Sequence, residues 1–237
     1  MESTTPDQEP AEAAPTAEPA PVLEKDPALE PLAEERPPVR LRLISDYICP
    51  WCYIGRVRAE RLRGDFPLQL QISAFDLRPG LPPEGLPREA VYGQRPEMEQ
   101  RSGYVRQLAA EEGIEMGRPA IIADTHRAHQ ATEFARESGL DPEFSLAVFR
   151  AYWQQERNIG DPRELLAIAG GVGVDVEGLE KALDEDRYAS AVNEQIRWAR
   201  WNGVTGIPTF VFNDRYALVG AEPYDVLARA VRRLAPA

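Results

Sequence analysis

The most informative stretch of this chain of 237 residues is Ser45-Asp46-Tyr47-Ile48-Cys49-Pro50-Trp51-Cys52-Tyr53-Ile54-Gly55. It follows a segment from Val39 to Ile44 in which apolar and basic residues alternate, as is typical of a strand that enters a core. Apolar residues at helical spacing then continue to Gly64-Asp65, and a second alternating segment runs from Leu68 to Phe75. The sequence therefore predicts a strand, a helix and a second strand, with two cysteines where the helix begins.

Cys49 and Cys52 are the two cysteines of the chain, and they stand three residues apart. Backbone N–H groups and the helix dipole stabilise an anion at the first turn of a helix, so we expect the Cys49 sulfur to be a thiolate near neutral pH. Pro50 suits the first helical position, where a missing N–H does no harm. Cys52 lies one turn further along, where it can close a disulfide with Cys49. This placement favours a redox-active pair.

Three other interpretations compete with a redox-active cysteine pair. The cysteines could form half of a zinc site that His126 and His129 complete, they could be two buried cysteines at this spacing by chance, or they could form an inert disulfide. No further cysteine is available for zinc. Two histidines without a third ligand more often serve packing and hydrogen bonding, so we expect no metal site.

A second segment, Gly203-Val204-Thr205-Gly206-Ile207-Pro208-Thr209-Phe210, places a proline at the start of a predicted strand. Together with the cysteine pair, this pattern predicts a cis Ile207–Pro208 bond. The backbone of Ile207 would then lie beside the sulfurs, where it can pair with a bound peptide or with glutathione. We also expect Trp51 to be exposed and to contact client peptides. The candidate substrate-binding residues around the sulfurs are Pro50, Trp51, Ile207 and Thr209.

Between these two segments the pattern is helical. We expect helices at Arg95 to Glu112, Thr125 to Ser138, Pro142 to Gln155, Pro162 to Gly170, Val176 to Asp184 and Arg187 to Trp201. A hairpin of Thr209 to Phe212 and Tyr216 to Val219 follows, and a helix from Tyr224 to Leu234 ends the pattern. This order predicts an α/β thioredoxin-like fold over residues 39–237, with an all-helical insertion at about 88–186. Arg40 and Arg42 should face solvent or protect a sheet edge.

The formal net charge of −12 is unevenly distributed. Residues 1–38 hold ten acidic and two basic residues and nine prolines, so eight of the twelve net negative charges lie there. Such a composition cannot bury enough apolar surface to fold, and we expect a disordered tail. The sequence pI of about 4.8 argues against binding to nucleic acid or an anionic membrane. We find no signal-peptide pattern and no long apolar run, so we expect a cytoplasmic protein.

The sequence resembles the DsbA-like thioredoxin family, and within it the cytoplasmic FrnE branch. The matching segments are S-D-Y-I-C-P-W-C-Y-I-G at 45–55, R-N-I-G-D at 157–161 and G-V-T-G-I-P-T-F-V-F at 203–212. The resemblance implies a thioredoxin fold with a helical insertion and thiol–disulfide exchange. It also implies that Cys49 is the nucleophile, Cys52 the resolving cysteine and Pro208 the cis-proline. His129 would lie in the insertion above the cleft and could assist proton transfer or stabilise the thiolate.

The leading hypothesis is thus a thiol–disulfide oxidoreductase that needs no cofactor besides its own Cys49–Cys52 disulfide. Its partner would be a protein or a low-molecular-weight compound bearing a thiol or disulfide, and the protein itself would be a monomer or homodimer. An alternative is a glutathione-dependent transferase or isomerase of small hydrophobic substrates, with glutathione as co-substrate. The resembling 2-hydroxychromene-2-carboxylate isomerases and kappa-class glutathione transferases carry a serine at the position of Cys49, which weakens that alternative. A client-binding protein without enzymatic activity is a third hypothesis.

Overall fold

The computed structural model describes residues 38–93 and 96–234, except for the side chains of 96–100. The predicted disordered tail, apart from Pro38, lies outside the described residues, as does the end of the chain from 235 to 237. The tail boundary and the limits of the insertion therefore stay predictions. None of the helices within the described ranges is long and apolar enough to cross a membrane.

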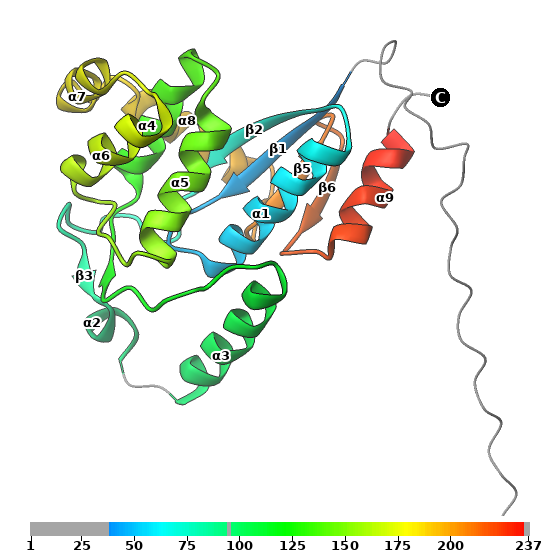
Figure 1. The fold of residues 1–237 in the computed structure, drawn as a ribbon, viewed down its shortest axis with the longest axis horizontal. Coiled ribbons are helices and arrows are strands. Elements are labelled where there is room, and N and C mark those ends of the chain that lie inside the picture. Colours follow the sequence, from blue (N-terminus) through cyan, green and yellow to red (C-terminus); the bar gives the residue numbers. More distant parts are fainter. Residues whose placement is uncertain (1–37, 94–95, 235–237) are drawn as a thin grey trace, which may run out of the picture. The chain divides into compact units, whose positions relative to one another are not determined.

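A four-stranded sheet forms the centre of the fold (Figure 1). The predicted strand–helix–strand unit is confirmed as β1 (Val39–Ser45), α1 (Pro50–Asp65) and β2 (Leu68–Ala74), with β1 and β2 parallel. The predicted hairpin is β5 (Thr209–Phe212) and β6 (Tyr216–Val219), and β5 pairs antiparallel with β1. The strand order β2-β1-β5-β6 places the two halves of the chain side by side.

Helices cover both faces of this sheet. On one face, α1 and α9 (Tyr224–Leu234) pack on the inward side chains of β1 and β5, among them Leu41, Leu43 and Phe210. On the other face, α8 (Ala189–Trp201) packs against Ile44 and Val211. Successive side chains of a strand point to opposite faces of the sheet, so β1 and β5 each contribute side chains to two separate apolar layers. These elements confirm the predicted thioredoxin-like fold.

The region between β2 and α8 is mainly helical, as predicted. Its elements are β3 (Leu86–Pro87), α2 (Arg88–Tyr92), α3 (Pro96–Glu111), β4 (Ile121–Ile122), α4 (His126–Glu137), α5 (Asp141–Trp153), α6 (Pro162–Val172) and α7 (Val176–Asp184). The expectation that this region is all-helical is wrong in one detail, because β3 and β4 pair as a two-stranded ladder. Two-residue strands carry no periodic signal, and the short α2 likewise escaped the pattern.

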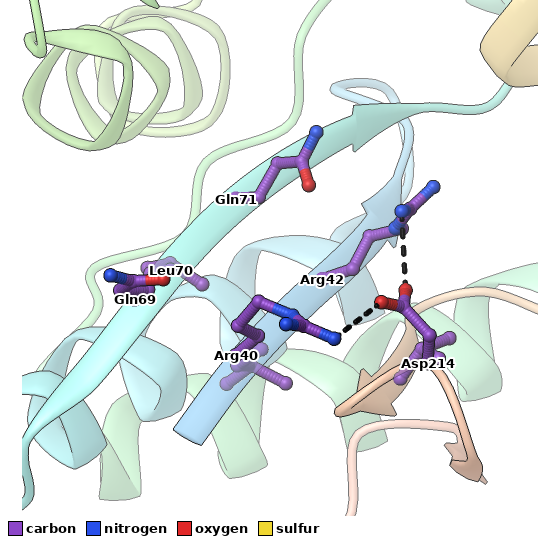
Figure 2. Close-up of a pocket in the computed structure, with 8 residues that line it drawn as sticks. Arg40, Arg42, Gln69, Leu70, Gln71 and Asp214 are labelled. Atoms are coloured by element: carbon purple, nitrogen blue, oxygen red, sulfur yellow. Dashed lines mark hydrogen bonds and ion pairs between the residues drawn. The ribbon is translucent and has the colours of Figure 1, made fainter. Parts of the chain in front are cut away.

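Arg40 and Arg42 lie on the face of β1 opposite α1. Both guanidinium groups form ion pairs with Asp214, at 3.1 and 3.2 Å (Figure 2). The guanidinium of Arg42 also lies 4.5 Å from the ring centre of Trp198. Protection of a sheet edge is the wrong interpretation of these arginines, since β1 is an interior strand between β2 and β5.

A buried arginine joins the helix of the cysteines to the insertion. Arg56 of α1 is fully buried; its Nε donates a hydrogen bond to Ser145 Oγ at 3.0 Å, and its Nη1 pairs with Glu60 at 2.8 Å. One turn earlier, the ring of Tyr53 stacks on Phe149 of α5 with centroids 5.4 Å apart. Because a buried charge is tolerated only with such partners, α1 and α5 are held in one relative position.

At Gly55, α1 packs closely against Pro208 and against Phe210 of β5. A Cβ atom added at Gly55 would lie 2.9 Å from Pro208 Cγ and 3.2 Å from Phe210 Cζ. The first distance is shorter than packed carbon atoms adopt and the second is tighter than most such contacts, and both neighbours are buried. The absence of a side chain at Gly55 is therefore required for α1 to pack against Pro208.

We predict that Gly55→Ala lowers the free energy of unfolding by about 1–3 kcal/mol, because the added methyl group overpacks the contact with Pro208. Gly64→Ala is the matched control in the same helix, since a Cβ there meets nothing within 4 Å. The control should leave stability unchanged or raise it by up to about 1 kcal/mol, as alanine favours the helix. Urea unfolding measures both; an equal effect of the two substitutions would contradict the packing argument.

Candidate active site

The site is built on the first turn of α1. Cys49 is the N-cap residue and Pro50 follows at the start of the helix, as the sequence predicted. The carbonyl of Cys49 accepts hydrogen bonds from the N–H groups of Cys52 at 3.1 Å and Tyr53 at 3.3 Å. The first turn contains no acidic residue, so the positive end of the helix dipole at Cys49 is not offset by a carboxylate of the same turn.

The two cysteines are free thiols in different surroundings. Cys49 is 5 % exposed, whereas Cys52 is fully buried. Burial raises the pKa of the Cys52 thiol, and the neighbouring Cys49 sulfur raises it further. The pair is thus asymmetric, because Cys49 lines a cavity whereas Cys52 is fully buried and does not line that cavity.

The loop before β5 completes the surroundings of Cys49. The Ile207–Pro208 bond is cis, as predicted. The Cys49 sulfur lies 3.9 Å from the carbonyl oxygen of Ile207, a weak S–H···O contact. The hydroxyl of Thr209 donates a hydrogen bond to the carbonyl of Gly206 at 2.6 Å, so its hydrogen is used within the protein. The contact of this loop with the Cys49 sulfur comes from Ile207.

Asp46 is a buried carboxyl group that the sequence analysis did not single out. It is fully buried and accepts hydrogen bonds from the backbone N–H groups of Leu77 at 2.7 Å and Ile48 at 3.3 Å, and its carboxylate also interacts with the Thr125 side chain. Burial raises the pKa of Asp46 to about 7. Its negative charge also contributes to the raised pKa of Cys52. The sequence shows only that a carboxylate lies three residues before Cys49. It does not show that the Asp46 side chain is buried.

His129 lies in α4, and its ring is buried. Its Nε2 contacts the carbonyl oxygen of Phe75 at 3.1 Å, and its ring lies 4.8 Å from that of Tyr47. A carbonyl only accepts, so Nε2 carries the proton. Burial lowers the pKa of His129 to about 3, which keeps the imidazole neutral at neutral pH. The structure does not bring His129 to the residues that surround the Cys49 sulfur, and the proposed role in proton transfer stays a prediction.

A cavity of about 280 Å3 opens beside Cys49, and we call it the arginine-lined cavity. Of the residues predicted from the sequence, Cys49, Pro50 and Trp51 line it, while Ile207, Pro208, Thr209 and His129 do not. Trp51 is half-buried against Tyr104, with ring centroids 6.0 Å apart, so the expected exposure of Trp51 is only partial. The remaining lining comes from residues that the sequence analysis missed: Ile48, Leu77, Arg88, Tyr92, Arg101, Ser102, Val105, Arg106, Met116, Gly117, Arg118 and Trp153.

The polar contacts of the two histidine rings are with residues other than the cysteines. His126 Nε2 lies 3.3 Å from Asn193 Oδ1, and His129 contacts Phe75. Within the described ranges, no cluster of three or more histidine, cysteine, aspartate or glutamate side chains is placed to hold a metal ion. The zinc interpretation of Cys49 and Cys52 therefore finds no ligand set in this part of the chain.

A family model described as a DsbA-like thioredoxin domain matches residues 40–232. The chain belongs to the DsbA-like thioredoxin family. The uncharacterised protein YwbO of Bacillus subtilis (strain 168) is 29 % identical to this chain over 196 residues. The matched region covers 81 % of this chain and 96 % of YwbO. The crystal structure of a probable DsbA oxidoreductase of Streptomyces coelicolor is 30 % identical, covers 82 % of this chain and 89 % of its own, and superposes with a TM-score of 0.74.

A more distant structure shares the fold of this DsbA-like domain. The structure of 2-hydroxychromene-2-carboxylate isomerase is 20 % identical, covers 82 % of this chain and 95 % of its own, and has a TM-score of 0.68. At this identity the likeness concerns the fold alone. The fold thus occurs both in a probable DsbA oxidoreductase and in an isomerase, and the chemistry must be argued from the residues at the site.

We predict that Asp46→Asn removes a pH dependence of stability. The unfolded carboxyl has an ordinary pKa of 3.8, whereas the folded one has a pKa of about 7. Between these values the folded protein holds a proton that the unfolded chain has released, so the wild type loses up to about 4 kcal/mol of stability as pH rises from 4 to 7. The free energy of unfolding of the variant minus that of the wild type should therefore increase across this window and level off above pH 7.

Denaturant unfolding of both proteins at pH steps from 4.5 to 8 measures this difference. The contributions of groups common to both proteins to the free energy of unfolding cancel in this difference. One such group is His129, whose lowered pKa makes stability fall as the pH drops below 6.5. A difference that stays constant with pH would show that Asp46 is not protonated in the folded state at mildly acidic pH.

Proposed function

We propose that this member of the DsbA-like family is a thiol–disulfide oxidoreductase that uses Cys49 as nucleophile and Cys52 as resolving cysteine. The observation that carries the proposal is the asymmetry of the pair: Cys49 caps the N-terminus of α1 at the edge of a cavity, and Cys52 lies fully buried one turn behind it. Helix N-termini favour thiolates, which are the reactive form in exchange.

In the proposed reaction the Cys49 thiolate attacks one sulfur of a substrate disulfide. The S–S bond of the substrate breaks, one half leaves as a thiolate, and the other half remains bound to Cys49 as a mixed disulfide. Cys52 then loses its proton and attacks the Cys49 sulfur, which releases the second half as a thiolate and forms the Cys49–Cys52 disulfide. The substrate gains two electrons and the pair loses two, which an external thiol partner must restore.

The loop before β5 supports the same chemistry. Ile207 presents its carbonyl 3.9 Å from the Cys49 sulfur, so a substrate chain that bonds to this backbone would place its own sulfur beside Cys49. The partner is a protein or a low-molecular-weight compound with a thiol or disulfide, glutathione being one candidate. The direction of transfer depends on the relative stability of the reduced pair, and a measured reduction potential against glutathione decides it. Membership of the FrnE branch and a cytoplasmic location stay predictions.

A glutathione-dependent transferase or isomerase is the second candidate, because the cavity beside Cys49 approaches the size of a small-molecule site. In that case Cys49 would only activate the glutathione sulfur, and Cys52 would have no chemical role. The two candidates therefore differ in what happens when the buried cysteine is replaced.

We predict that Cys52→Ser, incubated with oxidised glutathione, accumulates one glutathione per chain as a stable mixed disulfide at Cys49, since no second thiol resolves it. Cys49→Ser should form no adduct at the cavity and should lose catalysed exchange entirely. Intact-protein mass spectrometry detects the adduct, and turnover of a disulfide substrate measures catalysis. If Cys52→Ser keeps the wild-type turnover of the disulfide substrate, Cys52 is not the resolving cysteine and the proposed two-cysteine mechanism is wrong; if the wild type turns over no disulfide, the transferase or isomerase is favoured.

A further inference from the structure

The arginine-lined cavity concentrates positive charge beside the nucleophile. Its wall contains Arg88, Arg101, Arg106 and Arg118, and none of the described residues that line it is acidic. This composition contrasts with residues 39–237, which hold 29 acidic and 25 basic residues and thus have a formal net charge of −4. The positive charge of this cavity is therefore opposite in sign to the net charge of the protein. Such a local concentration of positive charge favours an anionic ligand.

The helix that carries Cys49 adds to this potential. The positive end of the α1 dipole lies at Cys49, and the first turn of α1 contains no acidic residue. An anion that enters the cavity would therefore meet the arginines and the helix N-terminus together, because Cys49 at that N-terminus lines the same cavity.

Two of the arginines are suited to direct recognition. Arg88 is held in place because its Nε donates to the carbonyl of Pro119 at 2.7 Å and its guanidinium lies 5.7 Å from the ring centre of Tyr92. Arg101, on α3, lines the cavity and its side chain is exposed, so an incoming ligand can reach its guanidinium. Arg106 and Arg118 have other interactions within the protein, and we assign them no contact with the ligand.

We propose that the arginine-lined cavity selects low-molecular-weight disulfides and thiols that carry carboxylates, with Arg88 and Arg101 binding a carboxylate while Cys49 reacts with the sulfur. Guanidinium groups bind carboxylates through paired, charge-assisted hydrogen bonds. The volume of about 280 Å3 lies near the lower end of small-molecule sites and favours a small ligand over a segment of a folded protein. The inference rests on the proposed function and adds to it the charge of the substrate.

Three small disulfides of similar size test the proposal: dithiodipropionate, which is dianionic, hydroxyethyl disulfide, which is neutral, and cystamine, which is dicationic. The rate at which each oxidises the reduced full-length protein is measured at low salt and at high salt. Each rate is divided by the rate of the same disulfide with free dithiothreitol, which removes differences in intrinsic reactivity. The net charge of the chain alone predicts a preference for cystamine, whereas the cavity predicts the opposite order.

We expect the normalised rate to be about tenfold higher for dithiodipropionate than for cystamine at low salt, and the preference to shrink at high salt. Arg101→Glu should reduce this preference by roughly fivefold or more, because it replaces a recognising cation with an anion. Arg197→Glu is the matched control for overall charge, since Arg197 lies on α8, is 71 % exposed and is not among the residues that line the cavity. It should leave the preference within about twofold of the wild type.

The outcomes separate the two proposals. If all three disulfides oxidise the protein but without a preference for the dianion, or if Arg101→Glu and Arg197→Glu have equal effects, the charge selection is wrong and the oxidoreductase proposal stands. A preference for acidic disulfide-bonded peptides but not for small dianions would likewise overturn the assignment to small molecules. If none of the disulfides oxidises Cys49 and Cys52, the proposed function itself fails.

Discussion

The contact between α1 and the start of β5 holds the two halves of the site together. Gly55 presents no side chain, so the helix approaches Pro208 and Phe210 to a distance that a methyl group would prevent. As a result, the Cys49 sulfur comes within 3.9 Å of the Ile207 carbonyl, although these residues are 158 positions apart in the chain. The proposed chemistry requires both the sulfur and the backbone beside it, and this packing contact brings them together.

The interior around this contact contains several ionisable groups, each of them paired. Asp46 accepts backbone hydrogen bonds from Ile48 and Leu77, Arg56 donates to Ser145, and His129 bonds to the carbonyl of Phe75. Buried polar groups persist only when such bonds offset the loss of water. The bonds of Asp46 to Leu77, of Arg56 to Ser145 and of His129 to Phe75 also connect separate segments, so they help to fix α1, α4, α5 and the loop after β2 relative to one another.

The thioredoxin part and the inserted region contribute different things to the site. The thioredoxin part supplies the reactive sulfur, the helix N-terminus and the Ile207 carbonyl, all on elements that pack on the central sheet. The inserted region supplies Arg88, Arg101 and most of the other residues of the cavity wall. Variation in the inserted region could thus change the ligand without disturbing the thiol chemistry, and this is how one fold can host different activities.

The sequence by itself determined the features that depend on local spacing. Alternation predicted β1 and β2, and helical periodicity predicted α1 and most of the inserted helices. The order of strand and helix placed Cys49 at the helix start, and the three-residue spacing placed Cys52 one turn on. The cis bond at Pro208 was predicted from two motifs taken together. The two-residue strands β3 and β4 were missed, because so short a pairing leaves no period to detect.

Tertiary structure alone decided which groups are buried and which gather around Cys49. Asp46 belonged to the most informative segment, yet only its burial between β1, the loop after β2 and Thr125 gives it a pKa of about 7. His129 is buried, and its imidazole bonds to the carbonyl of Phe75, 54 positions away in the chain. Arg88 and Arg101 are spread along the sequence with no common pattern, and the fold of the inserted region brings them to one cavity. The physical reason is the same in each case: burial and charge environment arise from contacts between segments far apart in the chain, which local spacing does not encode.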